Sequence, residues 1–210
     1  GIAGIACART LAQAGHHVTV FEKTDQVAGR MATLHSAFGS FDPGAQYFTV
    51  RDPRFQLALE STPKLCIRWS ANAVQTLDEL GRIMRSGPYS GEAHWVGVKG
   101  MQDLVAGWAA PLLAADQLKT QTRVTHIERD ALNKRQWQLR TESPDGALHV
   151  FSGFDTVILS TPAANAKALL DASRLAPAWS RSIDKVQVAP CWTLMLAFPQ
   201  AMQPGMSTLG

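Results

Sequence analysis

The stretch that decides the fold is GIAGIACARTLAQAGHHVTVFEK, residues 1–23. Apolar side chains recur in it at four-residue spacing, which predicts a helix over 2–14. Gly15 can adopt the left-handed conformation that ends helices, and the apolar residues of 18–21 predict a short strand. The acidic Glu22 closes this strand. The order is therefore a glycine turn, a helix, a second glycine, a strand and an acid.

This order matches most of a dinucleotide-binding βαβ unit, whose signature is G-x-G-x-x-G after a strand, with an acidic residue about 20 residues on. Gly1 and Gly4 match the last two glycines, and Glu22 follows Gly4 by 18 residues. Glycines there let the backbone approach a pyrophosphate and the helix pack on the sheet, and free N–H groups at the helix start hold phosphates. The preceding strand and first glycine are absent from the sequence, so we expect the chain to begin inside the motif. The alternative is a glycine-rich helix start in an unrelated α/β protein.

Two further segments favour FAD over NAD. They are VAGRM, residues 27–31, and FDPGAQYF, residues 41–48. With Glu22 they resemble the glutathione-reductase-like FAD proteins, and among these the amine oxidase and renalase group. Ala28 stands where a G-G-R segment of that group has its first glycine, whereas residues 41–48 look most like the bacterial renalase-like oxidoreductases. Three more segments extend the resemblance over nearly the whole chain: residues 95–101, 154–162 and 190–192.

The resemblance implies a mixed α/β fold with two discontinuous domains. One is a glutathione-reductase-like Rossmann FAD-binding domain with a β-meander crossover, expected over 1–52 and 98–175 and lacking its first strand. The other is an interleaved, incomplete substrate domain with an antiparallel sheet, expected over 53–97 and 176–210.

Spacing and composition place the other elements. We expect helices over 54–61, 101–112 and 163–171, strands over 65–69, 74–77, 123–129, 136–142, 148–151, 156–160 and 186–198, and turns or loops over 79–81, 86–91 and 144–147.

The resemblance also implies the cofactor-binding residues. Gly1 and Gly4 would face the FAD pyrophosphate, Glu22 the adenosine ribose, Arg30 the phosphate or ribityl region, and residues 44–46 the isoalloxazine ring. An arginine suits its role because its fork of N–H donors matches phosphate oxygens. The full expected set is Gly1, Ile2, Ala3, Gly4, Glu22, Lys23, Gly29, Arg30, Gly44, Ala45, Gln46, Val124, Thr161 and Pro162. The alternatives are a plain surface role for Arg30 and plain core roles for Tyr47, Phe48 and Val124.

By the same resemblance the protein is an FAD-dependent oxidoreductase. A hydride would pass from a substrate C–H bond to flavin N5, and dioxygen would take the electrons from reduced flavin. Similarity to renalase implies an isomeric dihydronicotinamide dinucleotide as the small-molecule substrate. An amine is the first alternative, and a non-catalytic binding module of the same fold is the second. No paired carboxylates or His/Glu constellation stands out, so no catalytic residue is predicted.

Composition argues against several other classes of protein. The net charge is +3 with no run of like charges, so no nucleic-acid or membrane surface is expected. No apolar run reaches the roughly 18 residues of a membrane span, and we expect no signal peptide. The three cysteines are isolated and the histidines lack metal-site spacing, so we expect free thiols, no metal and a reducing, cytoplasmic setting.

Overall fold

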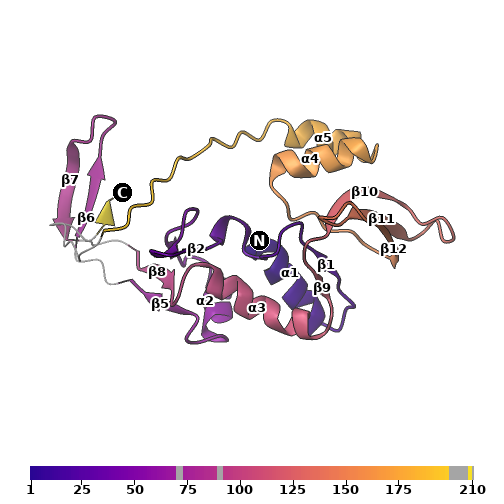
Figure 1. Ribbon diagram of the computed structural model, residues 1–210, viewed down its shortest axis with the longest axis horizontal. Helices are drawn as coiled ribbons and strands as arrows, with labels where there is room; N and C mark the ends of the chain where they lie inside the picture. The colour runs from indigo at the N-terminus through magenta and orange to yellow at the C-terminus, as the bar shows by residue number, and fades with distance from the viewer. Residues whose placement is uncertain (70–72, 89–91, 199–207, 210) are drawn as a thin grey trace. The chain divides into compact units, whose positions relative to one another are not determined.

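The computed structural model describes residues 1–69, 73–88, 92–198 and 208–209 (Figure 1). The chain divides into two compact units. The first unit comprises Gly1–Arg30 and Trp108–Trp192, and the second comprises Met31–Gly107 and Thr193–Gly210.

The first unit begins with helix α1 (Ile2–Gln13), as its four-residue apolar spacing predicts. Ile5 and Ala8 are its buried residues, so one narrow face packs inward. Gly15 follows the helix with a φ of +87°, in the left-handed region that glycine adopts without steric cost.

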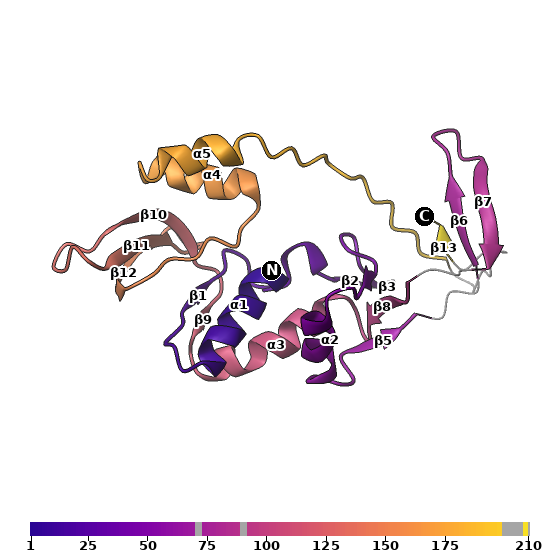
Figure 2. The same ribbon diagram turned by 180° about the vertical axis from the view of Figure 1, so that it is seen from behind.

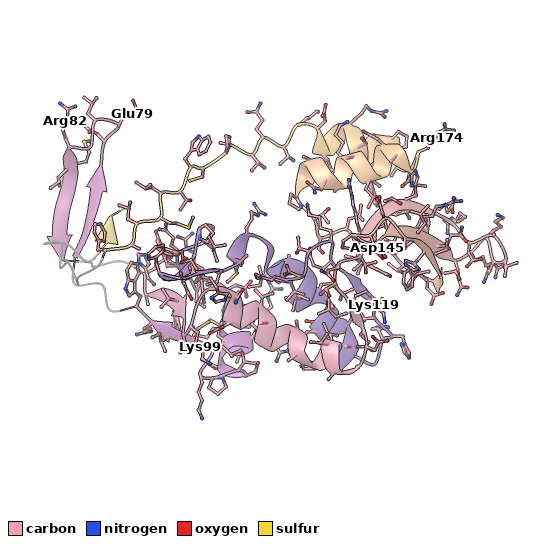
Figure 3. The ribbon with its side chains drawn as sticks, in the orientation of Figure 1. Glu79, Arg82, Lys99, Lys119, Asp145 and Arg174 are labelled. Atoms are coloured by element: carbon pink, nitrogen blue, oxygen red, sulfur yellow. The ribbon has the colours of Figure 1, made fainter. Side chains whose placement is uncertain are left out.

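Strand β1 (Val20–Phe21) pairs in parallel with β9 (Leu118–Lys119). The backbone N–H of Val20 donates to the Gln117 carbonyl at 2.7 Å, and that of Glu22 donates to the Lys119 carbonyl at 2.9 Å. Lys119, labelled in Figure 3, therefore lies beside the end of β1. Helix α3 (Gln102–Ala114) leads into β9. Its second half buries Trp108 and Leu112 in the first unit.

The predicted meander is confirmed. Strands β10 (Arg123–Arg129), β11 (Trp137–Glu142) and β12 (Leu148–Phe154) form one antiparallel sheet in sequence order. Asp145 lies in the tight turn between β11 and β12 (Figure 3). The ring of Phe21 meets those of Phe151 and Phe154 edge-on, with centroids 5.0 and 6.1 Å apart. These contacts join the meander to β1.

Helices α4 (Ala163–Ala172) and α5 (Pro177–Ile183) run side by side in Figures 1 and 2. Asp171 links them, because its carboxylate accepts hydrogen bonds from the Ser180 hydroxyl at 2.5 Å and from Lys167 Nζ at 2.7 Å. The Ser173 hydroxyl accepts from the Ile127 N–H at 2.9 Å, which ties α4 to β10.

Two predictions of strands are wrong. Residues 156–160 and 186–198 form no strand in the structure. A strand needs a neighbour to take its backbone hydrogen bonds, and no described segment pairs with either stretch. Apolar character alone could not reveal this.

The second unit contains three small sheets. Strands β2 (Leu34–Ser36) and β3 (Gly39–Phe41) form a hairpin. Strand β8 (His94–Gly97) lies between β4 (Phe48–Thr49) and β5 (Cys66–Arg68). The third sheet is built from β6 (Ala73–Leu77), β7 (Ile83–Pro88) and β13 (Thr208–Leu209).

The predicted turn over 79–81 is confirmed by the β6–β7 hairpin, with Glu79 and Arg82 at its turn in Figure 3. Arg82 donates to the Asp78 carboxylate from its backbone N–H at 2.8 Å and from Nε at 2.7 Å. The loop predicted over 86–91 is wrong for 86–88, which belong to β7 because Ser86 and Gly87 pair with β6. Residues 89–91 lie outside the described part of the chain.

Helix α2 (Pro53–Glu60) confirms the helix expected over 54–61. Asp52 caps it by accepting the Arg54 N–H at 2.8 Å, and Pro53 occupies the first helical position, where no N–H is needed. A short 3₁₀ helix, η1 (Gly29–Met31), lies between β1 and the β2–β3 hairpin in the sequence.

The start of α3 is held by two side chains from the hairpin segment. The Asp42 carboxylate accepts from the Met101 N–H at 3.0 Å and from the Thr33 hydroxyl at 2.6 Å. The Thr33 hydroxyl in turn accepts from the Gln102 N–H at 3.3 Å. Gly100 passes so close to Thr33 that any added Cβ would collide with its side chain. Asp42 therefore fixes the segment FDPGAQYF on the N-terminus of α3.

Candidate nucleotide-binding site

The first turn of α1 has backbone N–H groups without a side-chain cap. Gly1 is the N-cap, and in the described part of the chain no side chain bonds to the cap and no acidic residue lies in the first turn. Gly1 contributes only its carbonyl, which accepts the Ile5 N–H at 3.2 Å. The N–H groups of the first turn, from Ile2, Ala3 and Gly4, are therefore available to an anion, and the helix dipole favours negative charge there.

Gly29 passes directly beside Gly1. A Cβ on Gly29 would lie 3.1 Å from the Cα of Gly1, tighter than most real contacts. Gly29 also has a φ of +57°, which disfavours any residue with a side chain. Ala28 is 3% exposed, so a methyl group is accommodated where the related segment has glycine. The structure thus brings the GRM segment against the glycine turn.

Gly4 abuts Ser160 from a distant part of the chain. A Cβ on Gly4 would lie 2.5 Å from Ser160 Oγ, so only glycine fits without movement. Thr161 and Pro162 follow directly and are exposed, with Pro162 as the N-cap of α4. Both predicted residues therefore lie near the first turn of α1.

Glu22 lies at the end of β1, and its backbone is fixed on both sides. Its N–H donates to the Lys119 carbonyl, and its carbonyl accepts from the Thr122 N–H at 2.8 Å. Its side chain is 18% exposed, and Oε2 lies 3.8 Å from the Gly1 nitrogen. The acid therefore lies beside the glycine turn.

The remaining predicted residues of the first unit are more peripheral. Lys23 and Arg30 are exposed, and neither side chain has a hydrogen bond or an ion pair within the described ranges. Val124 is half-buried in β10 opposite Thr141. Because Thr122 bonds to Glu22, the start of β10 lies beside the acid.

Gly44, Ala45 and Gln46 belong to the second unit. They follow Asp42 and Pro43, and the Pro43 carbonyl accepts the Thr193 hydroxyl at 2.7 Å. Gly44 and Gln46 are exposed, whereas Ala45 is half-buried. The chain is therefore held directly before these three predicted residues, by the hydrogen bonds of Asp42 and Pro43.

An aromatic stack in the second unit begins at Tyr47, directly after Gln46. The ring of Tyr47 stacks on the buried His94 with centroids 4.0 Å apart, and Trp69 lies 6.1 Å from Tyr47. Tyr47 itself is 38% exposed. One edge of the stack therefore stays open to solvent.

Two residues that contact the predicted site, Thr24 and Ser160, were not predicted from the sequence. Thr24 donates to Glu22 Oε1 from both its backbone N–H at 3.0 Å and its hydroxyl at 2.9 Å. Ser160 closes on Gly4, as described above. A threonine two residues after an acid is a usable signal for the first contact, whereas nothing local signals the second.

No metal centre is evident among the described residues, and one of the three thiols is held in its protonated form. No group of three or more His, Cys, Asp or Glu gathers in the part searched. Burial raises the pKa of the Cys66 thiol to about 11, with a smaller contribution from Asp103, which keeps it in the weakly nucleophilic thiol form. Within the described ranges, no helix is both long enough and apolar enough to cross a bilayer.

Two family models match this chain. Residues 1–60 match the NAD(P)-binding Rossmann-like domain, and residues 88–207 match the flavin containing amine oxidoreductases. The chain belongs to the flavin-containing amine oxidoreductase family. Its flavin confirms the cofactor class expected from residues 22–48, and the Rossmann-like match confirms the mixed α/β assignment with a dinucleotide-binding start.

Two solved structures share the fold. A fatty acid isomerase from P. acnes that produces CLA superposes with a TM-score of 0.63 at 15% identity, covering 88% of this chain and 62% of the isomerase. A redesigned putrescine oxidase gives a TM-score of 0.56 at 14% identity, covering 80% and 58%. The chain thus spans about three fifths of these structures.

One curated relative matches over a short stretch. A 4,4'-diapophytoene desaturase (4,4'-diaponeurosporene-forming) from Staphylococcus haemolyticus is 44% identical over 52 residues. The match covers 25% of this chain and 10% of the desaturase.

Proposed function

We propose that the protein is an FAD-dependent oxidoreductase whose adenosine diphosphate site is the N-terminus of α1. The observation that carries this proposal is the convergence of Gly1, Gly29 and Glu22 on an uncapped helix start. Free N–H groups suit the pyrophosphate, and close glycines let it approach the backbone. A carboxylate with one unoccupied oxygen suits a ribose hydroxyl.

The other predicted residues complete the binding surface. Arg30 and Lys23 are exposed cations near the glycine turn in sequence, and Arg30 is suited to pair with phosphate oxygens. Val124 would pack near the adenine, and Thr161 and Pro162 would border the cofactor. Gly44, Ala45 and Gln46 would lie along the isoalloxazine ring.

We propose the same domain division as the resemblance implies. The FAD-binding domain would comprise 1–52 and 98–175 in a glutathione-reductase-like arrangement, and the substrate domain 53–97 and 176–210. The tie between Asp42 and α3 supports grouping the first two of these ranges.

Bound FAD would supply a two-electron acceptor for a substrate C–H bond, with dioxygen as the final acceptor. The chain's own residues bind, orient and shield the cofactor. No acid or base is assigned, because oxidation of a C–H bond by flavin does not require one.

The substrate we propose is an isomeric dihydronicotinamide dinucleotide. The segment FDPGAQYF, with its likeness to renalase-type proteins, supports this choice. Tyr47, a residue of that segment, stacks on His94 and stays partly exposed, and an exposed aromatic side chain suits a planar ring better than an aliphatic amine. An amine is the second candidate, favoured by the family to which residues 88–207 belong.

The test is the visible spectrum of the purified full-length protein, followed by anaerobic reduction with a panel of substrates. The panel contains α- and β-dihydronicotinamides, their 2- and 6-dihydro isomers, and amines including putrescine. Flavin bands that bleach with a 2- or 6-dihydro isomer support the proposal, and bleaching with amines alone favours the second candidate. Bound flavin that no panel member reduces points to a binding module. A colourless protein that takes up no added FAD contradicts an FAD enzyme altogether.

A further inference from the structure

The two oxygens of the Glu22 carboxylate are not equivalent. Oε1 accepts two hydrogen bonds from Thr24, at 3.0 Å from the backbone N–H and 2.9 Å from the hydroxyl. Oε2 has no hydrogen bond from any described residue and lies 3.8 Å from the Gly1 nitrogen. One oxygen is therefore held by the protein, and the other is left for a ligand at the glycine turn.

The Thr24 hydroxyl has a second acceptor. It lies 2.7 Å from the Gln26 carbonyl as well as 2.9 Å from Glu22 Oε1. A hydroxyl carries one proton, so it donates to only one of the two at a time. In both arrangements the Thr24 N–H stays on Oε1, while the hydroxyl proton goes either to the acid or to the Gln26 carbonyl in the turn that runs on toward Gly29.

The position of Thr24 is fixed without any ligand. Its carbonyl accepts from the Gln121 N–H at 2.9 Å, next to the bond from Thr122 N–H to the Glu22 carbonyl. Glu22 and Thr24 thus continue the backbone pairing of β1 with the chain after β9. These backbone hydrogen bonds hold the Thr24 hydroxyl beside Glu22 without a bound nucleotide.

We infer that Thr24 is a positioning residue for ribose recognition: it occupies Glu22 Oε1 and thereby aims Oε2 at the adenosine ribose. This inference rests on the proposed FAD site. Thr24 does not itself touch the ribose, so it acts on FAD affinity only through Glu22. Preorganising the acceptor removes a cost that an unrestrained carboxylate would incur when FAD binds.

The experiment measures FAD affinity of the full-length apoprotein by titration for four variants. Thr24→Val removes the hydroxyl and keeps the shape, and Thr24→Ser restores the hydroxyl. Glu22→Ala and the double variant Glu22→Ala/Thr24→Val complete a double-mutant cycle. Thr10→Val is the matched control, since the Thr10 hydroxyl donates at 2.9 Å to the Ala6 carbonyl within α1, and both threonines are exposed.

We expect Thr24→Val to weaken FAD binding about threefold to tenfold, as loss of one hydrogen bond implies. Thr24→Ser should bind like wild type, Thr10→Val should leave affinity unchanged, and Thr24→Val should have no effect once Glu22 is alanine. The melting temperature of the apoprotein should change little in Thr24→Val.

Two results overturn the inference. One is an unchanged affinity in Thr24→Val while Glu22→Ala binds weakly. The other is an equal loss from Thr24→Val with and without Glu22, which means that Thr24 acts independently. If wild type binds no FAD, or Glu22→Ala binds normally, the proposed FAD site fails instead.

Discussion

Asp42 accepts a hydrogen bond from the backbone N–H of Met101 at 3.0 Å, across 59 residues of chain. The same oxygen accepts the Thr33 hydroxyl, so one carboxylate caps α3 and holds the hairpin segment. We predict that Asp42→Ala lowers the free energy of unfolding by about 1–3 kcal/mol, because two donors lose their partner. Chemical denaturation measures it, and Asp42→Asn should lose less because its carbonyl still accepts. Equal losses in both variants would show that the charge, rather than the acceptor, matters.

Gly29 should tolerate no side chain, for two separable reasons. Its φ of +57° makes Gly29→Ala cost about 1–2 kcal/mol, and its Cβ would crowd Gly1. Gly146→Ala is the matched control, since Gly146 has a φ of +82° and no atom within 4 Å of an added Cβ. Both variants should lose thermal stability, whereas only Gly29→Ala should also weaken FAD binding, by tenfold or more. Normal FAD titration of Gly29→Ala would remove Gly29 from the site.

Glu22→Ala should weaken FAD binding about 10- to 100-fold, as expected for a lost hydrogen bond to a charged group. FAD titration of the full-length apoprotein measures it. Glu60→Ala provides a control on an exposed acid, whose carboxylate accepts from the exposed Gln56 amide at 2.9 Å in α2. Similar affinities in the two variants would contradict the ribose role.

The stabilising contribution of Asp52 should be lost within a defined acid range. The Arg54 side chain, with help from its backbone N–H, lowers the pKa of the Asp52 carboxyl from 3.8 to about 2. A lowered folded-state pKa means that the contribution is present above the ordinary pKa and is lost as the pH falls toward 2. Asp52→Asn keeps the N-cap but does not titrate, so its melting temperature should fall less steeply than that of wild type between pH 4 and about 2. Parallel curves would show that Asp52 does not titrate with folding.

Local patterns predicted the elements that local forces specify. Helix α1 follows from its apolar spacing, and the meander follows from alternating strands broken at Asp145. Glu22 could be predicted because the acid and the glycines belong to one short motif. Its contact with Thr24 was open to inference for the same reason, since both residues are neighbours in sequence.

What the sequence could not predict depends on partners far along the chain. Residues 156–160 are as apolar as a central strand, yet strand formation is decided by a neighbouring backbone. Ser160 meets Gly4 only through the path of the whole first unit. The loop predicted over 86–91 failed because Ser86 and Gly87 have turn-like composition but pair with β6. Pairing overrides composition in that hairpin.

Phe21, directly before Glu22, rests edge-on against Phe151 and Phe154 of β12. Phe151 lies 130 residues after Phe21 in the sequence, so the contact is of the long range that slows folding. Ribosomes add roughly 5–20 residues per second. Helix α1 and Glu22 would therefore be synthesised many seconds before β12, whose rings pack against the neighbouring Phe21. The proposed nucleotide site around Gly1 and Glu22 should therefore gain affinity for its ligand only after β12 has been synthesised.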